Sequence, residues 1–378
     1  MGVVYLYAGV SPAVFVSRVM DALANEDTVL PVPPGMNSAD VSALGDELVE
    51  QAAGPGVAFL TSGSVGTSKV VVRDAYSVLS EAADVAWALG LTQKSVVLIT
   101  TPITHSFGFG MVMAAAGIAG SFTLTTPQEN IHARLRSIRA FLAVGDVTVM
   151  TGVPYIYRML LRDPPERVAA LSYAGGEVVP VSLVADWWDN HDRPLLQEYG
   201  LSECGIVTFG HVGDPSNSIG RPIPHTHIDI AKDGELIVFR PSNPVCYLRG
   251  ESPETFVLGR GVRTGDSGRQ TAGRYFLEGR LKSVIRVAGK SVVPEEIERA
   301  ILRYPGVEEA LVIGVPDPTL GEVPVAFVVP VRPELTGTLL RIWLSESMPH
   351  WKVPKLIHFV QALPRSTNGK VVRRGPDV

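Results

Sequence analysis

The chain has 378 residues, more than a single domain usually contains, so we expect two domains. Its formal net charge of -5 argues against a general nucleic-acid-binding surface. The two cysteines, Cys204 and Cys246, offer neither a disulfide framework nor a metal cluster, and the first residues do not form the pattern of a secretory signal. We therefore expect a cytoplasmic protein in a reducing compartment.

Strand and helix patterns alternate along the chain, which predicts an α/β fold built in layers. Residues 3–7 are expected to form a strand. Ser11-Pro12 then supplies an N-cap and a first-turn proline for a helix that ends near Ala24. After a turn at residues 31–35, a second helix is expected around residues 41–51.

The segment from Ser95 to Gln128 carries no formal charge, and residues 107–124 are largely apolar. Length alone would permit a membrane span here. Because four glycines interrupt the apolar residues, we instead expect a strand at residues 96–100, a buried helix and another strand. The sequence thus predicts no membrane span.

A loop rich in glycine and hydroxyl side chains runs from Thr61 to Lys69, directly after the apolar residues 57–60. Glycines allow backbone N–H groups to approach an anion closely, while the hydroxyls and the lysine add donors and positive charge. A strand end is also where nucleotide sites of α/β proteins usually lie. The loop is therefore a candidate phosphate-binding site, with an ordinary turn as the alternative. Its spacing from Gly63 to Lys69 is not that of a Walker loop.

Further motifs follow the loop in a fixed order: Tyr199-Gly200-Leu201-Ser202-Glu203, Arg263-Thr264-Gly265-Asp266, Gly279-Arg280-Leu281-Lys282 and residues 363–370. Together with the loop, this series resembles the adenylate-forming (AMP-binding) superfamily of acyl-CoA synthetases, aryl-acid ligases and stand-alone adenylation enzymes. The resemblance runs from about Val57 to Arg374. Several ordered motifs are far more specific than any one of them.

The resemblance implies a large layered α/β domain at residues 1–279, with the ATP and acyl sites, and a small mobile α+β domain at residues 280–378 with the catalytic lysine. In the second domain, Pro294 followed by glutamates is expected to begin a helix. Relatives usually carry a longer segment before the phosphate loop, so the N-terminal region is expected to be shortened. A homodimer is one way to cover the surface that this exposes.

The implied activity is ATP-dependent activation of a carboxylic acid through an acyl-adenylate, with release of pyrophosphate. Transfer to a phosphopantetheine thiol would follow, on either CoA or a separate carrier protein. Two alternatives stay open: transfer to an amine or another acceptor, and a catalytically inactive nucleotide-binding subunit. A serine hydrolase does not fit, because residues 200–204 lack the final glycine of a nucleophile elbow.

The resemblance also implies roles at the reacting centre. Lys370 would bridge the α-phosphate and the carboxylate, Ser202 would donate to the α-phosphate, and Glu203 would bind Mg²⁺. His105 would lie beside the adenylate. The simpler alternatives are a solvated lysine, a surface carboxylate at a helix start and a loop histidine.

Nucleotide-binding roles are implied for a larger set: Thr61, Ser62, Gly63, Ser64, Gly66 and Lys69 for the departing phosphates, Gly175, Gly176, Glu177, Tyr199 and Gly200 for adenine, and Asp266 and Arg280 for ribose. Asp266 is acceptor-only, which suits both ribose hydroxyls; a turn cap is its alternative role. Tyr199 could instead be a core aromatic. Val65 and Ser68 replace the threonine and proline usual in the family.

The acyl pocket implied by resemblance consists of Phe107, Val153, Tyr155, Tyr173, Gly175, Leu201 and Cys204. These residues are mostly apolar or aromatic, which favours an aromatic or medium-length acyl acid. The Phe-Asp pair of amino-acid adenylation domains is absent, which disfavours an amino acid. Lys282 corresponds to the hinge of the small domain, and Gly289 to the channel for the incoming thiol.

Overall fold

The computed structural model describes residues 2–7, 9–50, 54–61, 69–118, 121–124, 131–241, 246–249, 256–257, 261–331, 334–365, 371–373 and 375. The chain divides into two compact units. Unit 1 contains Met1–Asp229, Ile237–Thr264 and Ala272–Arg274, and unit 2 contains Ile230–Leu236, Gly265–Thr271 and Tyr275–Val378.

The first sheet of unit 1 consists of β1 (Val3–Tyr7), β2 (Thr28–Val32), β3 (Gly56–Thr61), β4 (Lys69–Asp74) and β14 (Cys246–Arg249), side by side in that order. β1, β2 and β3 are parallel, whereas β4 is antiparallel to both β3 and β14. Helix α2 (Ser38–Glu50) covers one face of this sheet through Leu44 and Leu48. Helices α1 (Pro12–Ala24), α3 (Ala75–Ala88) and α4 (Ser106–Ile118) pack on the other face.

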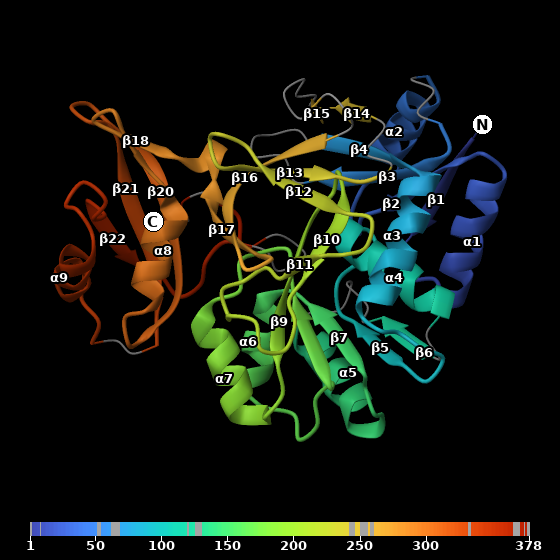
Figure 1. Ribbon diagram of the computed structural model, residues 1–378, viewed down its shortest axis with the longest axis horizontal. Helices are drawn as coiled ribbons and strands as arrows, with labels where there is room; N and C mark the ends of the chain where they lie inside the picture. The colour runs from blue at the N-terminus through green and yellow to red at the C-terminus, as the bar shows by residue number, and fades with distance from the viewer. Residues whose placement is uncertain are drawn as a thin grey trace. The chain divides into compact units, whose positions relative to one another are not determined.

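The second sheet consists of β5 (Val96–Ile99), β6 (Ser121–Leu124), β7 (Val149–Gly152), β8 (Leu171–Ala174), β9 (Leu195–Leu201), β10 (Gly205–Phe209) and β11 (Arg221–Pro222). Its strand order is β11-β10-β9-β8-β7-β5-β6, and the strands from β9 to β6 are parallel. Helices α5 (Ile131–Val144), α6 (Pro154–Leu161) and α7 (Val181–His191) cover one face (Figure 1). The other face packs against α3 and α4, so unit 1 has alternating helical and sheet layers.

A third sheet contains β12 (His227–Ile230), β13 (Glu235–Phe239), β16 (Gly261–Thr271) and β15 (Phe256–Val257) in that order, with β17 (Arg274–Arg280) beside β16. Its strands β12, β13, β16 and β17 contain residues of both units.

The rest of unit 2 consists of the 3-10 helix η2 (Leu281–Ser283), β18 (Ile285–Val287), β19 (Lys290–Val292), α8 (Pro294–Leu302), β20 (Val307–Asp317), β21 (Gly321–Pro330), α9 (Gly337–Ser347) and β22 (Leu356–Phe359). The fourth sheet has the order β19-β18-β21-β20, with β22 beside β21. Helices α8 and α9 pack on it around Ile297, Ile301, Leu340 and Leu344.

Local signals explain where several helices begin. The Ser11 hydroxyl accepts a hydrogen bond from the backbone N–H of Val14, and Pro12 occupies the first turn of α1, as the sequence predicts. Asp74 caps α3 in the same way, with Oδ1 2.5 Å from the N–H of Ser77. Helix α8 begins at Pro294, which confirms the helix start predicted there.

The apolar segment after Ser95 forms β5, α4 and β6, which confirms the strand, buried helix and strand expected there. The ring of Phe109 in α4 is fully buried and meets the rings of Phe15 and Phe59 edge-on, with centroids 5.6 and 5.3 Å away. Within the described part of the chain, no helix combines the length and apolar character needed to cross a membrane.

One expected turn is shorter than predicted. Pro31 and Val32 belong to the buried strand β2, and only the residues after them form the turn. β2 pairs with β3 only through Thr28 and Val29, so Pro31 lies beyond that ladder, where a strand tolerates a missing N–H donor. Because proline disfavours a strand locally, the sequence predicted a turn at Pro31 and Val32.

Candidate functional site

Four parallel strands of unit 1, β5, β7, β8 and β9, end at the same edge of the second sheet. Ligands of open α/β sheets bind beyond this carboxyl edge. The last residues of β9 and the segments that follow the four strand ends carry the following predicted site residues: His105, Phe107, Val153, Tyr155, Gly175, Gly176, Glu177, Tyr199, Gly200, Leu201, Ser202, Glu203 and Cys204. The topology therefore gathers at one edge residues that are up to about 100 positions apart in the chain.

Ser202 and Glu203 lie in the turn between β9 and β10. Leu201 pairs with Gly205 across this hairpin, and the N–H of Cys204 donates to the carbonyl of Leu201 over 3.1 Å. Both Ser202 and Glu203 are half-buried. The structure thus places Glu203 in a hairpin turn and not at a helix start.

Four charged side chains are buried beneath this hairpin: Arg73 at the end of β4, Glu81 and Asp84 in α3, and Arg240 after β13. We call them the buried charge cluster. Arg73 Nη1 lies 2.6 Å from Glu81 Oε2, and both side chains are 1% exposed. Arg240 Nη2 lies 3.1 Å from Asp84 Oδ2, with exposures of 1% and 6%. The cluster is therefore two ion pairs with little exposure to water, and Asp84 Oδ1 also lies 2.9 Å from Nδ1 of the exposed His225.

Two members of the cluster hydrogen-bond the hairpin backbone directly. Glu81 Oε1 accepts from the N–H of Ile206 over 2.7 Å, and Arg240 Nη1 donates to the carbonyl of Ile206 over 2.9 Å. Gly205 has φ +74°, and a β-carbon there would lie 2.2 Å from Glu81 Oε2. Only glycine allows both this backbone conformation and this close approach.

Burial in this region changes two proton affinities. It lowers the pKa of the Arg240 guanidinium, a shift that the neighbouring carboxylates of Glu81 and Asp84 oppose. It raises the pKa of the Cys204 thiol, which therefore stays protonated and is no nucleophile. Cys204 is 1% exposed and can only pack in this site.

The sequence analysis missed the buried charge cluster, although it contains a signal for it. Arg73 directly follows the buried valines 70–72, and Glu81 lies in an apolar part of α3. Charges inside apolar runs are seldom fully buried unless they are paired. Such a pattern indicates partners elsewhere in the chain but does not name them.

The predicted acyl-pocket residues differ in burial. Val153, Tyr173 and Cys204 are buried, whereas Phe107, Tyr155 and Leu201 are half-buried. Tyr173 meets the ring of Phe209 edge-on at 5.0 Å, and burial raises the pKa of its phenol to about 12. The Tyr173 side chain is therefore uncharged at physiological pH and forms an apolar wall of the predicted acyl pocket.

The adenine-side and histidine candidates are also placed. Tyr199 is 7% exposed in β9, and Gly176 has φ +80° in the segment after β8. His105 precedes α4, with its N–H 3.1 Å from the carbonyl of Pro102 and its carbonyl accepting from Phe109.

The phosphate loop is described only at its two ends. Thr61 ends β3, Lys69 begins β4, and the two residues are directly paired in the antiparallel ladder. Ser62, Gly63, Ser64 and Gly66 lie outside the described residues.

In unit 2, Asp266 and Arg280 form an ion pair, with Oδ1 and Nε 3.0 Å apart. The Asp266 side chain is 9% exposed, whereas that of Arg280 is 58% exposed. The preceding residue, Gly265, donates its N–H to the buried Glu235 over 2.7 Å, which holds the backbone at Asp266. The two predicted ribose ligands are thus neighbours.

The remaining candidates of unit 2 lie in turns and short segments. Lys282 is in η2, and Gly289, with φ +79°, is in the two-residue turn between β18 and β19. Lys370 lies outside the described residues, but the chain is held on both sides of it. Arg365 pairs with Glu309 on one side, and Arg373 contacts Glu298 over 2.9 Å on the other.

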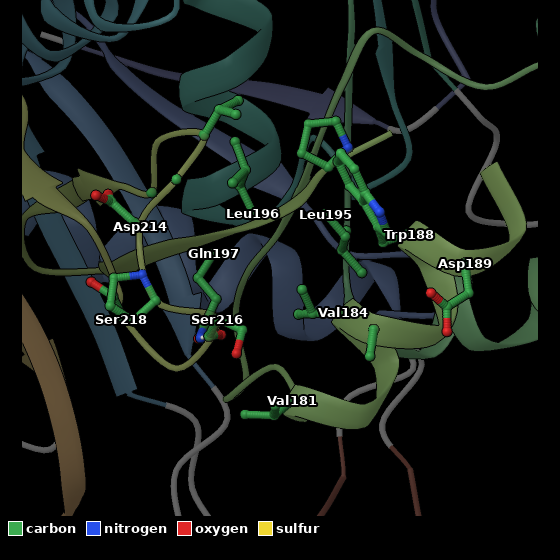
Figure 2. A pocket seen from close by; sticks show the side chains of 16 residues that line it. Val181, Val184, Trp188, Asp189, Leu195, Leu196, Gln197, Asp214, Ser216 and Ser218 are labelled. Atoms are coloured by element: carbon green, nitrogen blue, oxygen red, sulfur yellow. Dashed lines mark hydrogen bonds between the residues drawn. The ribbon is translucent and has the colours of Figure 1, made fainter. Parts of the chain in front are cut away.

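A cavity of about 320 Å³ lies elsewhere in unit 1, between α7, the start of β9 and residues 210–218. Figure 2 shows Trp188 and Val184 of α7 lining it with Gln197 of β9. Because it adjoins the first residues of β9, it lies at the opposite end of that strand from Ser202. Among the described residues that line it, none is a predicted site residue.

Comparison with known proteins identifies the family. A family model described as AMP-binding enzyme matches residues 25–251, and one described as AMP-binding enzyme C-terminal domain matches residues 296–370. The first match alone covers more than half of the 378 residues. The chain belongs to the AMP-binding enzyme family. The resemblance to the adenylate-forming superfamily is thereby confirmed.

Two curated relatives of this AMP-binding enzyme are named as a CoA ligase and an acyl-CoA synthase. A propanoyl:CoA ligase from Mycobacterium tuberculosis, whose acyl group carries a methyl-dioxo-octahydro-indenyl ring system, is 33% identical over 330 residues, which cover 82% of this chain and 64% of the relative. Feruloyl-CoA synthase from Amycolatopsis sp is 29% identical over 335 residues, which cover 83% of this chain and 67% of the relative. The chain thus spans about two thirds of the length of these relatives.

The fold agrees with that of a solved structure. ATP-bound MatB from Rhodopseudomonas palustris has a TM-score of 0.84 at 21% identity, over 98% of this chain and 86% of that structure. This likeness confirms the predicted α/β class.

The close approach of Gly205 and Glu81 yields a stability prediction for this AMP-binding enzyme. Gly205→Ala places a β-carbon against a carboxylate that Arg73 already holds, whereas Gly213, with φ +88°, has no atom within 4 Å of that position. Both alanine variants have the same positive-φ strain, so the difference between their free energies of unfolding measures the cost of the contact with Glu81. We expect Gly205→Ala to lower the free energy of unfolding by about 1–3 kcal/mol more than Gly213→Ala. Equal urea midpoints would contradict this packing.

Proposed function

We propose that this AMP-binding enzyme activates a carboxylic acid with ATP and then transfers the acyl group to the thiol of CoA. In the first step a carboxylate oxygen attacks the α-phosphorus, and pyrophosphate leaves in line. In the second step the thiol attacks the acyl carbon, and AMP leaves. The observation that supports the proposal is that β5, β7, β8 and β9 end at a single carboxyl edge, where the candidate residues lie.

The first step brings two anions together, so the enzyme must supply positive charge and donors where charge develops. The loop from Thr61 to Lys69 would hold the departing phosphates, with the paired ends of β3 and β4 fixing its span. Ser202 would donate to the α-phosphate. Lys370 would neutralise charge on the reacting oxygens, on a segment that Arg365 and Arg373 anchor.

Separate residues would recognise the ribose and the adenine of the nucleoside. Asp266 would accept from the ribose hydroxyls while Arg280 holds its carboxylate. Tyr199, Gly200 and the segment 175–177 would contact adenine.

The carboxylate of Glu203 fits Mg²⁺, a cation that prefers oxygen ligands and keeps several from phosphate and water. Within the described residues, no group of three or more His, Cys, Asp or Glu could hold a metal ion. Because Mg²⁺ keeps several ligands from phosphate and water, the ion would arrive with the nucleotide, and Glu203 would be its protein ligand. When bound, it would neutralise phosphate charge.

The acyl group is proposed to be aromatic or of medium length. The buried Val153 and Tyr173 and the half-buried Phe107 and Tyr155 support this, because they offer apolar and aromatic walls. The two named relatives act on acids that carry rings, a feruloyl group in one case and a fused bicycle in the other. His105 would lie beside the adenylate.

Lys370→Ala tests the first step. A well-aimed donor at a reacting centre contributes about 2.7–4 kcal/mol, so we expect acid-dependent exchange of pyrophosphate into ATP to fall about 10²- to 10³-fold. The dissociation constant of ATP should change little, because other residues hold the nucleotide. The exposed Lys232 offers a matched control, since Lys232→Ala removes the same charge elsewhere in unit 2. Near-normal exchange in the Lys370 variant would remove this lysine from the mechanism.

The second step is proposed to need a rearrangement of the small domain about a boundary near residue 280. Lys282, within the short helix η2, would be the hinge, because hinges concentrate backbone change in a few residues at element ends. Gly289 would then face the incoming thiol from the tight turn between β18 and β19.

A pocket of unit 2 supports CoA as the acceptor. It measures about 350 Å³, adjoins the Gly289 turn through Ala288 and Lys290, and is lined by Trp351, His350 and Lys355 among others. Lys290 Nζ lies 3.6 Å from the centroid of the Trp351 ring. An aromatic face beside lysines suits a purine nucleotide, which CoA carries and a carrier-protein phosphopantetheine arm lacks.

Trp351→Ala tests this acceptor assignment. Because stacking of a base on an aromatic ring contributes about 1–3 kcal/mol, we expect the KM for CoA to rise about 5- to 150-fold. The KM for pantetheine, which has no nucleotide, should stay unchanged, as should pyrophosphate exchange without thiol. Trp188→Ala is the matched control, since Trp188 is a half-exposed tryptophan of unit 1. If the KM values for CoA and for pantetheine rise equally, the pocket does not bind the nucleotide. A carrier protein or an amine then becomes the acceptor to test.

A further inference from the structure

The buried charge cluster controls the conformation of the hairpin that carries Ser202 and Glu203. Glu81 holds the N–H of Ile206 from one side, while Arg240 holds the carbonyl of the same residue from the other. Arg240 Nη1 also lies 3.5 Å from the carbonyl of Cys204, the residue directly after Glu203. The backbone is thus clamped within one to three positions of the proposed Mg²⁺ ligand.

We propose that Glu81 and Arg240 are positioning residues, which set the Ser202–Glu203 turn for Mg²⁺-nucleotide binding. Arg73 and Asp84 hold these two side chains in place through the ion pairs of the cluster. This inference rests on the proposed function for the role of Glu203, but the clamp itself rests on contacts within unit 1.

Stability alone does not account for the cluster. Removing four charges from water carries a desolvation penalty that the attraction within each pair often fails to exceed, and apolar side chains of similar size commonly replace such pairs without loss. α3 already packs against the core through Val78, Ala82 and Val85. What an apolar replacement could not supply is an acceptor for the N–H of Ile206 and a donor for its carbonyl.

The cluster acts through geometry and not through its field. Its two positive and two negative charges cancel, so it places no net charge beneath the turn. Each pair also orients its partner: Arg73 contacts Ser77 Oγ over 3.0 Å and Glu81 over 2.6 Å, which leaves Glu81 Oε1 aimed at Ile206. A small displacement of a catalytic group costs rate steeply, so even a slight relaxation of the turn should be measurable.

Two double variants distinguish the effect of the hairpin's position from the effect of the charges of the Arg73–Glu81 pair. Arg73→Met with Glu81→Met removes one ion pair and the acceptor for Ile206, and Arg73→Met with Glu81→Gln removes the same pair but keeps an acceptor oxygen. Each pair is replaced as a unit, because removing one partner would leave a buried charge uncompensated. The two variants therefore differ mainly in the hydrogen bond to the hairpin.

We expect the Met/Met variant to retain a cooperative melting transition, because both charges of the pair are removed together. Acid-dependent pyrophosphate exchange should fall about 10- to 100-fold, and the Mg²⁺ concentration for half-maximal rate should rise at least several-fold. The Met/Gln variant should recover most of both losses. A purely structural role would depress the melting temperature of both variants and leave the Mg²⁺ dependence unchanged.

Wild-type exchange and Mg²⁺ dependence in the Met/Met variant would overturn the proposal, as would equal losses in the two variants. If the Met/Met variant does not fold, Asp84→Met with Arg240→Met tests the other side of the clamp by the same measurements. If the wild type shows no pyrophosphate exchange with any acid tested, the proposed function fails instead. Calorimetry of ATP binding with and without Mg²⁺ then still tests the clamp, and an unchanged Mg²⁺ effect in the Met/Met variant would overturn it.

Discussion

The parallel register of β5, β7, β8 and β9 is the constraint on which the site depends. Parallel strands joined by helices all point the same way, so every segment that leaves a carboxyl end meets the others at one edge. Helices α5 to α7 cover one face of the sheet and α3 and α4 pack on the other, so polar side chains gather at the edge. The position of the site follows from packing, and its chemistry from the residues placed there.

The hairpin after β9 departs from this parallel pattern, and other contacts hold its backbone in place. β10 turns back antiparallel to β9 after the turn that contains Ser202 and Glu203. Buried ion pairs from β4, α3 and the residue after β13 supply that hold, and the positive φ of Gly205 lets Glu81 approach. A site that is polar and close to solvent is thus supported by charges that solvent does not reach. The same principle recurs in unit 2, where the buried Glu235 holds the backbone beside Asp266.

Sequence reasoning predicted what depends on local signals and ordered motifs. The N-cap at Ser11, the buried helix α4, the start of α8 at Pro294 and the layered α/β class all follow from neighbouring residues and periodicity, and the family resemblance followed from motifs in order. What it could not predict depends on distant pairing. Asp84 and Arg240 are 156 positions apart, and nothing near either residue names the other. β2 was hidden because Pro31 opposes a strand locally and is tolerated only where the ladder to β3 has ended. The roles of the site residues stay predictions, and for Lys370 and most of the phosphate loop so does their geometry.

The central claim is that a carboxylate oxygen attacks the α-phosphorus of ATP. The most direct measurement uses an aromatic acid labelled with ¹⁸O in its carboxylate, incubated with the enzyme, Mg²⁺, ATP and CoA. Because the attacking oxygen stays on the α-phosphorus when the thiol displaces AMP, mass spectrometry should find a single ¹⁸O atom in AMP and none in pyrophosphate. Formation of ADP with ¹⁸O in orthophosphate would show attack at the γ-phosphorus and would contradict the account.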